Sequence, residues 1–177
     1  MSRNIGTNTL CERNNCLVCI FPGSRGMCKV ESITYQISCC RSPCVTNNFV
    51  PTKPFKLEDS PNNNPSLYRG ESSRTPYIRS QTHLKDYRAR KDSSALWRHC
   101  VESHQSISGP DRGLRDFQMV KLETWPKPLD RLSAEGVLIQ ELETLQHQDR
   151  AKCINNKQDF KQAHTVTMKF TTGSNND

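Results

Sequence analysis

The sequence predicts an α+β fold: a small three-stranded antiparallel sheet flanked by helices, with a Cys-rich, zinc-binding segment at its N-terminal end. Segments of two-residue hydrophobic alternation are interspersed with segments of helical periodicity, in an order typical of this class. Hydrophobic residues make up only 33% of the 177 residues, so the core is small. Seven of the nine cysteines fall within the first 44 residues, where bound metal can supply stability that a small core lacks.

These observations divide the chain into three parts. Residues 1–30 are expected to form the Cys-rich zinc-binding segment, residues 31–165 the folded domain and residues 166–177 a flexible tail. Within the domain, residues 45–65 contain four prolines and five asparagines, which predicts an insertion loop.

Three segments of the domain are typical of strands. Apolar and polar residues alternate over 31–38, which predicts a half-buried strand. A second strand is expected over 66–69, ended by Gly70, and a third over 117–122. The first two strands can pair as a hairpin across the long loop between them.

Three segments are typical of helices. Thr75 is a good N-cap and Pro76 suits the first helical position, so a helix is expected from there to about Arg90. A third helix is expected over about 130–145. The second helix lies between them, with Asp92 or Ser93 as its cap and a buried stripe of Leu96, Trp97, Cys100 and Val101.

The charge balance narrows the partners. The net charge of +7 favours a polyanion, DNA first, although the same charge can simply keep a polar protein in solution. No apolar run approaches the roughly 20 residues that a membrane helix needs, and the first fifteen residues are polar. We therefore expect no membrane partner, no secretory signal, no small-molecule substrate and an intracellular location, with the nucleus as one candidate compartment.

The first group of chemically informative residues is a cysteine cluster. Its spacing of four, two and eight residues suits zinc, because a Cys-x2-Cys turn supplies half of a tetrahedral ligand set. A redox pair and free thiols in an unfolded segment are the alternatives. The four residues are Cys11, Cys16, Cys19 and Cys28.

A second group combines two cysteines after the first strand with two histidines at the end of the second helix. Two Cys and two His form a common zinc-ligand set. Five residues cover about 500° of helix, so His104 must lie beyond the helix end if both rings are to reach one ion. In the alternative, His99 interacts with the helix dipole and His104 is a surface residue. The four candidates are Cys39, Cys44, His99 and His104.

A third group carries a family resemblance. It consists of Ile33-Thr-Tyr35, then Tyr68-Arg-Gly-Glu-Ser-Ser-Arg74, then Arg79-Ser-Gln-Thr-His83. In this order and spacing it resembles the GIY-YIG nuclease superfamily. The tract from Tyr68 to His83 is similar to the branch found at the C-terminus of Penelope-like retroelement proteins. The segments 11–19, 95–104, 134–137 and 154–160 are similar to further parts of that branch, whereas Arg69 replaces a residue that is normally apolar.

The resemblance implies a DNA endonuclease that hydrolyses phosphodiesters with a divalent ion. Tyr35 would then activate water, Arg79 would neutralise phosphate charge and Glu135 would hold Mg²⁺, which a single carboxylate with waters and phosphate oxygens suits better than zinc. It also implies supporting roles: Tyr68 positions the water or phosphate, His83 assists and Asn155 orients the site. The expected DNA-binding residues are Arg74, Lys85, Arg88 and Arg90.

Two alternatives to an active nuclease stay open on the sequence. One is a catalytically inactive, zinc-dependent nucleic-acid-binding module, and the other is a decayed fragment of such an element. Retention of the tyrosines, Arg79 and Glu135 favours the active enzyme. Oligomeric state is not predicted.

Overall fold

The computed structural model describes residues 11, 13, 15–19, 26–41, 44, 65–104, 116–149 and 151–155. The predicted insertion loop at 45–65, apart from Pro65, and the predicted tail at 166–177 lie outside the described residues. The same holds for the part of the C-terminal similarity that follows Asn155.

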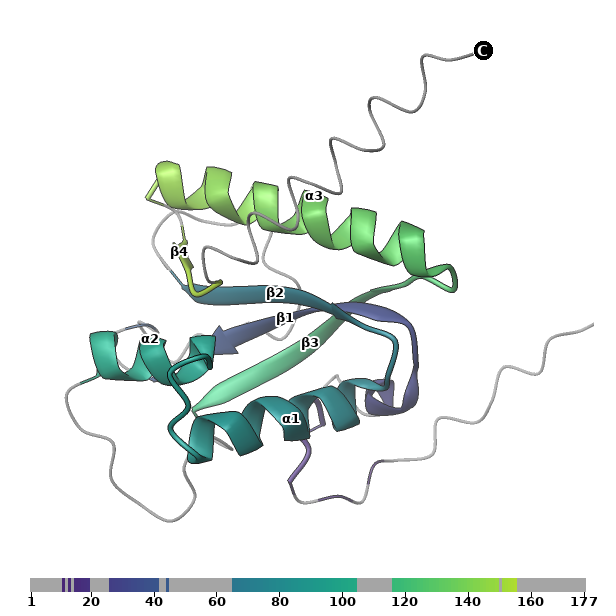
Figure 1. The fold of residues 1–177 in the computed structure, drawn as a ribbon, viewed down its shortest axis with the longest axis horizontal. Helices are drawn as coiled ribbons and strands as arrows, with labels where there is room; N and C mark the ends of the chain where they lie inside the picture. Colours follow the sequence, from purple (N-terminus) through teal and green to yellow (C-terminus); the bar gives the residue numbers. More distant parts are fainter. Residues whose placement is uncertain are drawn as a thin grey trace, which may run out of the picture.

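The sheet has four strands in the order β3-β1-β2-β4 (Figure 1). The central strands β1 (Ile33–Cys39) and β2 (Ser66–Ser72) are antiparallel, and β3 (Phe117–Thr124) is antiparallel to β1. The fourth strand, β4 (Lys152–Cys153), pairs with β2 in parallel. The expected hairpin pairing is confirmed, but the expectation of three antiparallel strands is wrong. A two-residue strand is too short to produce a periodic pattern in the sequence.

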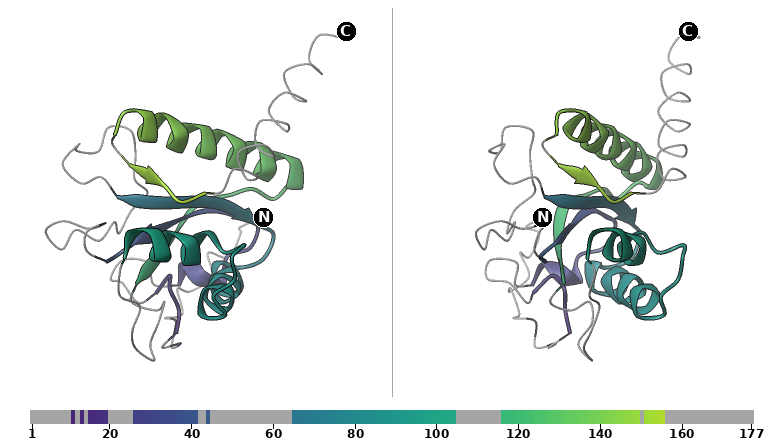
Figure 2. Two further views of the ribbon diagram at one scale, coloured as in Figure 1. Left: turned by 60° about the vertical axis from the view of Figure 1, so that its left-hand side comes forward. Right: turned by 90° about the vertical axis from the view of Figure 1, so that its left-hand side faces the viewer.

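Helices cover both faces of the sheet. α3 (Pro128–His147) lies on one side, and α1 (Pro76–Arg88) and α2 (Ala95–Ser103) lie on the other, as the views in Figures 1 and 2 agree. A short 3-10 helix, η1 (Met27–Lys29), lies near α1. No helix in the described part of the chain is long and apolar enough to cross a membrane.

Strand β1 is buried along its whole length, so the prediction of a half-buried strand is wrong. Ile33, Tyr35 and Ile37 belong to the larger apolar core. On the opposite face Gln36 accepts a hydrogen bond from Arg69 Nε at 3.3 Å, beneath α3. A central strand covered on both faces can still alternate in sequence when one covered face is polar.

The helix boundaries differ slightly from those expected. Thr75 caps α1, because its Oγ1 accepts from the backbone nitrogen of Ile78 at 3.3 Å. Helix α2 is capped by Ser94 instead of Asp92 or Ser93. The exposed fraction of Val101 is 57%, so Val101 does not belong to the buried stripe of α2.

Polar contacts attach α3 to β2. The side chain of Arg69 is buried, and its Nη1 donates to Glu141 Oε2 at 2.6 Å and to the carbonyl oxygen of Leu138 at 2.9 Å. Glu71 and Arg131 form a second ion pair. The small apolar cluster beside them contains Leu67, Leu142, Leu145 and Ala151. Arg69 therefore anchors α3 from a strand position that is usually apolar.

Candidate active site and metal centres

Two tyrosines lie side by side on the face of the sheet that α1 covers. The register pairs Tyr35 with Gly70 and Ile37 with Tyr68, which brings the two phenol rings to 6.1 Å between centroids at an interplanar angle of 26°. Gly70 leaves the space that the Tyr35 ring occupies. A Cβ atom added at Gly70 would lie 2.7 Å from Tyr35 Oη and 3.0 Å from Tyr68 Cε1. A larger residue at position 70 is thus incompatible with this arrangement.

Helix α1 places Arg79 and His83, one turn apart, over the hydroxyl group of Tyr35. Arg79 Nε donates to Tyr35 Oη at 2.9 Å, and His83 Nε2 lies 2.8 Å from the same oxygen. A guanidinium group can only donate. The Tyr35 oxygen therefore accepts from Arg79, and its own O–H can donate to His83 in the tautomer whose Nε2 carries no proton.

The protonation states support this direction. Burial, together with the charge of Arg79, lowers the pKa of His83 to about 3, so the imidazole is neutral at neutral pH. Burial raises the pKa of Tyr35 to about 12, although Arg79 acts in the opposite direction. Burial also disfavours the charge of Arg79, but Tyr35 and Tyr68 outweigh it and raise the pKa of the guanidinium. At neutral pH the group is a charged Arg79, a neutral Tyr35 and a neutral His83.

Glu135 reaches the same region from the other side of the sheet. Strand β4 pairs with residues 66 and 67 of β2, and within the described part of the chain no strand pairs with the outer edge of β2 at Glu71. Glu135 Oε1 accepts the backbone N–H of Glu71 there, at 3.1 Å. The Glu135 carboxylate is half-buried and close enough to Tyr35 to favour its neutral form. One carboxylate of fixed orientation thus lies within electrostatic reach of Tyr35.

Asn155 lies on the same edge of β2. It bonds to Arg69, two residues before Glu71, whose N–H donates to Glu135. Its Oδ1 accepts from the backbone nitrogen of Arg69 at 2.9 Å, and its Nδ2 donates to the carbonyl oxygen of Arg69 at 2.7 Å. The side chain therefore continues the pairing that β4 begins. It supports the edge of the strand and, within the described residues, makes no hydrogen bond to Arg79, Tyr35 or His83.

The predicted DNA-binding residues are all exposed but do not form one surface. Arg88 follows Arg79 by nine residues, about two and a half helical turns, so the two lie on opposite flanks of α1. Lys85 also points away from the sheet. The guanidinium carbon of Arg90 lies 5.6 Å from the ring centre of Trp97, and Arg74 lies in the turn between β2 and α1. Of these four, only Arg74 lies at the end of β2 that carries Gly70.

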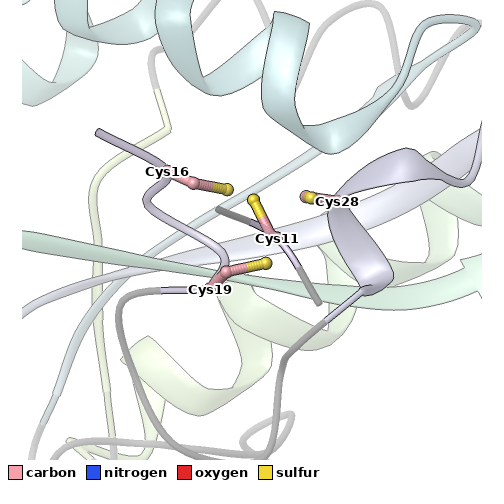
Figure 3. Close-up of side chains that lie close together, drawn as sticks. All are labelled: Cys11, Cys16, Cys19 and Cys28. Carbon is pink, nitrogen blue, oxygen red and sulfur yellow. The ribbon is translucent and has the colours of Figure 1, made fainter. Parts of the chain in front are cut away.

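The N-terminal cysteines converge as expected. The sulfur atoms of Cys11, Cys16, Cys19 and Cys28 point toward one another (Figure 3) and all lie within 4.8 Å of one another. Zinc with bonds of about 2.3 Å to sulfur holds its ligands about 3.8 Å apart, so the cluster fits this ion. A tight turn, in which the backbone nitrogen of Cys19 donates to the carbonyl oxygen of Cys16 at 3.1 Å, presents two of the ligands.

This first cluster fastens the N-terminal segment to the domain. The carbonyl oxygen of Leu17 accepts from the backbone nitrogen of Met119 in β3 at 3.3 Å. On the other side, Gln81 Nε2 donates to the carbonyl oxygen of Asn15 at 2.8 Å. A metal bound by these cysteines would therefore hold β3 and α1 to one short segment.

The second cluster lies where β1 ends and α2 ends. Cys39 Sγ is 3.3 Å from His104 Nε2, and Cys44 Sγ is 3.4 Å from His99 Nε2. Helix α2 ends at Ser103 and His104 is extended, as the two-histidine arrangement requires. Both histidines are buried, so the alternative of a surface His104 does not apply. All four ligand atoms lie within 4.8 Å of one another, and their chemistry again fits zinc.

Two residues that the motif does not contain orient this second cluster. Ser103 Oγ is 3.3 Å from His99 Nδ1, which leaves Nε2 for the metal, and Lys152 Nζ donates to Ser103 Oγ at 2.9 Å. Such partners fix the orientation of a ligand ring. A hydrogen bond with Cys39, together with His99, lowers the pKa of the Cys44 thiol, whereas the same hydrogen bond and burial raise the pKa of Cys39, so Cys44 is the first of the two to become a thiolate. Serine and lysine are too common to reveal this role in a sequence.

The structure thus gathers most of the predicted catalytic residues into one candidate active site, and the predicted zinc ligands into two clusters that could hold a metal ion. Comparison with models of known protein families, with curated proteins and with solved structures gives no match. Function is therefore inferred from side-chain geometry. The candidate active-site residues are Tyr35, Tyr68, Gly70, Arg79, His83 and Glu135.

Proposed function

We propose that this protein is a divalent-metal-dependent DNA endonuclease of the GIY-YIG type, as in Penelope-like retroelement proteins, with two structural zinc ions. The observation that supports the proposal best is the hydrogen-bonded chain from Arg79 through Tyr35 to His83, beside the Glu135 carboxylate. Phosphodiester hydrolysis needs an activated water, stabilisation of developing charge and usually a metal ion. These four side chains cover the three tasks, with Tyr35 and His83 acting together on the water. DNA as substrate makes the nucleus the expected place of action.

Arg79 is the group for the phosphate. Its guanidinium remains charged under all relevant conditions, and its planar shape suits two oxygens of one phosphate. The bond from its Nε to Tyr35 also fixes where the guanidinium lies. The charge that develops on the non-bridging oxygens in the transition state is then met by a donor that is already in place.

Tyr35 and His83 form the proton-accepting pair. A pKa near 12 leaves almost no free phenolate at neutral pH, so Tyr35 alone is a poor base. In the proposed step, water gives a proton to Tyr35 Oη while the phenolic proton moves to His83 Nε2. The resulting hydroxide attacks phosphorus, and the bond to the leaving oxygen breaks. The leaving oxygen departs with the bonding electrons and is protonated from solvent.

The phosphate itself prepares His83 for this step. After burial, the charge of Arg79 is the main reason for the low pKa of His83. A phosphate bound to Arg79 would offset that charge and raise the pKa of the imidazole. His83 would accept a proton more readily when substrate is present than when the site is empty.

Glu135 suits a hard divalent cation. Its backbone hydrogen bond fixes the carboxylate while the side chain stays half-buried, at the edge of the site. Mg²⁺ prefers one or two carboxylates, completed by waters and phosphate oxygens. When bound, Mg²⁺ would lower the pKa of the attacking water and neutralise phosphate charge. Glu135 would hold the ion next to Tyr35.

Cleavage of supercoiled plasmid tests the proposal. The purified zinc-loaded chain is incubated with plasmid with and without added Mg²⁺. Mg²⁺ is omitted instead of chelated, because a chelator would also remove zinc. We expect Mg²⁺-dependent nicking that Glu135→Gln abolishes, whereas Glu123→Gln, the same change at an exposed position of β3, should nick normally. A wild-type chain that binds the plasmid without nicking it would support the inactive binding module instead.

A further inference from the structure

We propose that a second phosphate site lies in the groove between α2 and residues 152–155, where Arg98 and Lys152 bind the DNA backbone away from the cut. This inference rests on the proposed function, since it assigns contacts for the same DNA. The residues that line the groove include Arg98, Glu102, Lys152 and Asn155. None of the predicted DNA-binding residues is among them.

The outer edge of β2 connects this groove with the candidate active site. Lys152 pairs with Ser66 at one end of the strand, and Glu135 caps Glu71 at the other. Five residues of strand span about 16 Å, the rise of about five base pairs of B-DNA. A duplex laid along this edge would have backbone phosphates at both ends.

The two basic side chains are suited to a phosphate in different ways. Arg98 is exposed, and in the described part of the chain its guanidinium has neither a hydrogen bond nor an ion pair. Lys152 uses one of its three N–H donors for Ser103 Oγ, which fixes the ammonium group and leaves two donors for a ligand. The groove thus combines a guanidinium group that can adjust its position with an ammonium group that is held in place.

The charge balance of the groove remains positive. Among the described residues that line it, Glu102 is the one acidic side chain, against the two basic side chains of Arg98 and Lys152. The second metal cluster adds no net charge when occupied, because two thiolates offset the two charges of zinc. Glu102 weakens the attraction of the groove for phosphate. If the proposal holds, removing the charge of Glu102 should therefore increase the affinity for DNA.

The experiment measures duplex affinity against salt concentration. All variants carry Glu135→Gln, so the labelled duplex is not cut. The double variant Arg98→Gln/Lys152→Gln is compared with a control, the double variant Lys85→Gln/Arg88→Gln. The control also removes two positive charges, but from the sides of α1 that do not carry Arg79. Each lost phosphate contact lowers the slope of log Kd against log salt by about 0.9, so the groove variant should lose about 1.8. The control should lose far less, and Glu102→Gln should tighten binding roughly two- to fivefold.

Two further variants separate charge from folding. Lys152→Arg keeps the charge, and Arg98→Gln changes only an exposed helix position, so both should retain two zinc ions per chain. Equal slopes for the groove and control variants would overturn the inference, as would loss of all duplex binding. A groove-specific change of slope in a chain that never nicks plasmid would support the inference while the proposed nuclease function fails.

Discussion

At the scale of single residues, Arg79 has two partners in the proposed reaction, the phosphate and Tyr35. Arg79→Ala should lower the nicking rate roughly 100-fold or more, as loss of one transition-state donor typically does. Duplex affinity should change little, because it is the sum of many phosphate contacts. Nicking rates and affinities of Arg79→Ala and Arg88→Ala are compared. Equal nicking rates for wild type and Arg79→Ala would show that the site is wrongly assigned.

Gly70 is required by the close approach of Tyr35, not by its backbone conformation. In Gly70→Ala the new Cβ would lie 2.7 Å from Tyr35 Oη, and Tyr35 cannot move freely because Arg79 and His83 hold it. We expect a loss of about 1–3 kcal/mol in unfolding free energy and a larger loss of nicking. Urea unfolding of both single variants and of Gly70→Ala/Tyr35→Phe forms a double-mutant cycle. Strictly additive effects would contradict the proposed clash.

His83 makes stability depend on pH in a defined direction. Its pKa is about 3 in the folded protein and about 6.5 when unfolded, so between these values the unfolded chain binds a proton that the folded chain does not. Stability should therefore fall as pH drops below about 6.5, by up to about 1.4 kcal/mol per pH unit from this group. His83→Gln should lack that contribution. Unfolding of both proteins is compared from neutral to mildly acidic pH, with zinc content checked at each point. If the unfolding free energies of the two proteins depend on pH in the same way, His83 takes up its proton at the same pH in the folded protein as in the unfolded chain.

At the scale of elements, the sequence was most informative where one residue type has one strong local role. Thr75 and Pro76 mark the start of α1, and they do so because capping is a local interaction. Strand β4 and the burial of β1 could not be predicted. Both depend on what α3 and residues 151–155 cover, which is tertiary information. Val101 shows the same limit, since helical spacing alone does not tell which side is covered.

The ion pair between β2 and α3 should respond asymmetrically to substitution. The Arg69 side chain is 2% exposed, whereas that of Glu141 is 36% exposed. Glu141→Ala leaves a buried cation without its partner and should cost about 3 kcal/mol. Arg69→Met leaves a carboxylate that water can reach, so it should cost less. Urea unfolding of the two variants gives the comparison, and a greater loss for Arg69→Met would mean that the bonds of Arg69 to Leu138 and Gln36 dominate.

At the scale of the whole molecule, zinc chemistry made the metal centres predictable, because it restricts both ligand type and spacing. The candidate active site could be proposed from the sequence only through a family resemblance, and the contacts of its residues could not be predicted. The side chains of Arg69 and Glu141 meet across 72 positions of sequence, and Ser103 reaches His99 through a bond that no motif records. Partners of this kind follow from packing, so a sequence without aligned relatives does not reveal them.

Two zinc ions per chain are expected, and their removal should unfold the domain cooperatively. Elemental analysis gives the stoichiometry, and circular dichroism during chelation gives the unfolding. Cys16→Ser and Cys44→Ser should each reduce the zinc content by about one ion. Cys40→Ser is the matched control, since Cys40 belongs to neither cluster and its loss should leave both ions bound. A chain that is cooperatively folded with less than one zinc would exclude a structural role for the metal.

The outer margins of the sheet have a consequence for self-association. An edge strand with unpaired backbone N–H and C=O groups can pair with a strand of a second chain. Here the outer edge of β3 is bonded at Met119 by the backbone of Leu17, which lies between two cysteines of the first cluster. The outer edge of β2 is covered by β4, Asn155 and Glu135 in succession. The segment between two candidate zinc ligands and the carboxylate proposed for catalysis therefore also cover backbone groups at the edges of the sheet. If zinc occupies the first cluster as proposed, its loss would free the edge of β3 for intermolecular β-pairing, and metal supply would then affect solubility as well as folding.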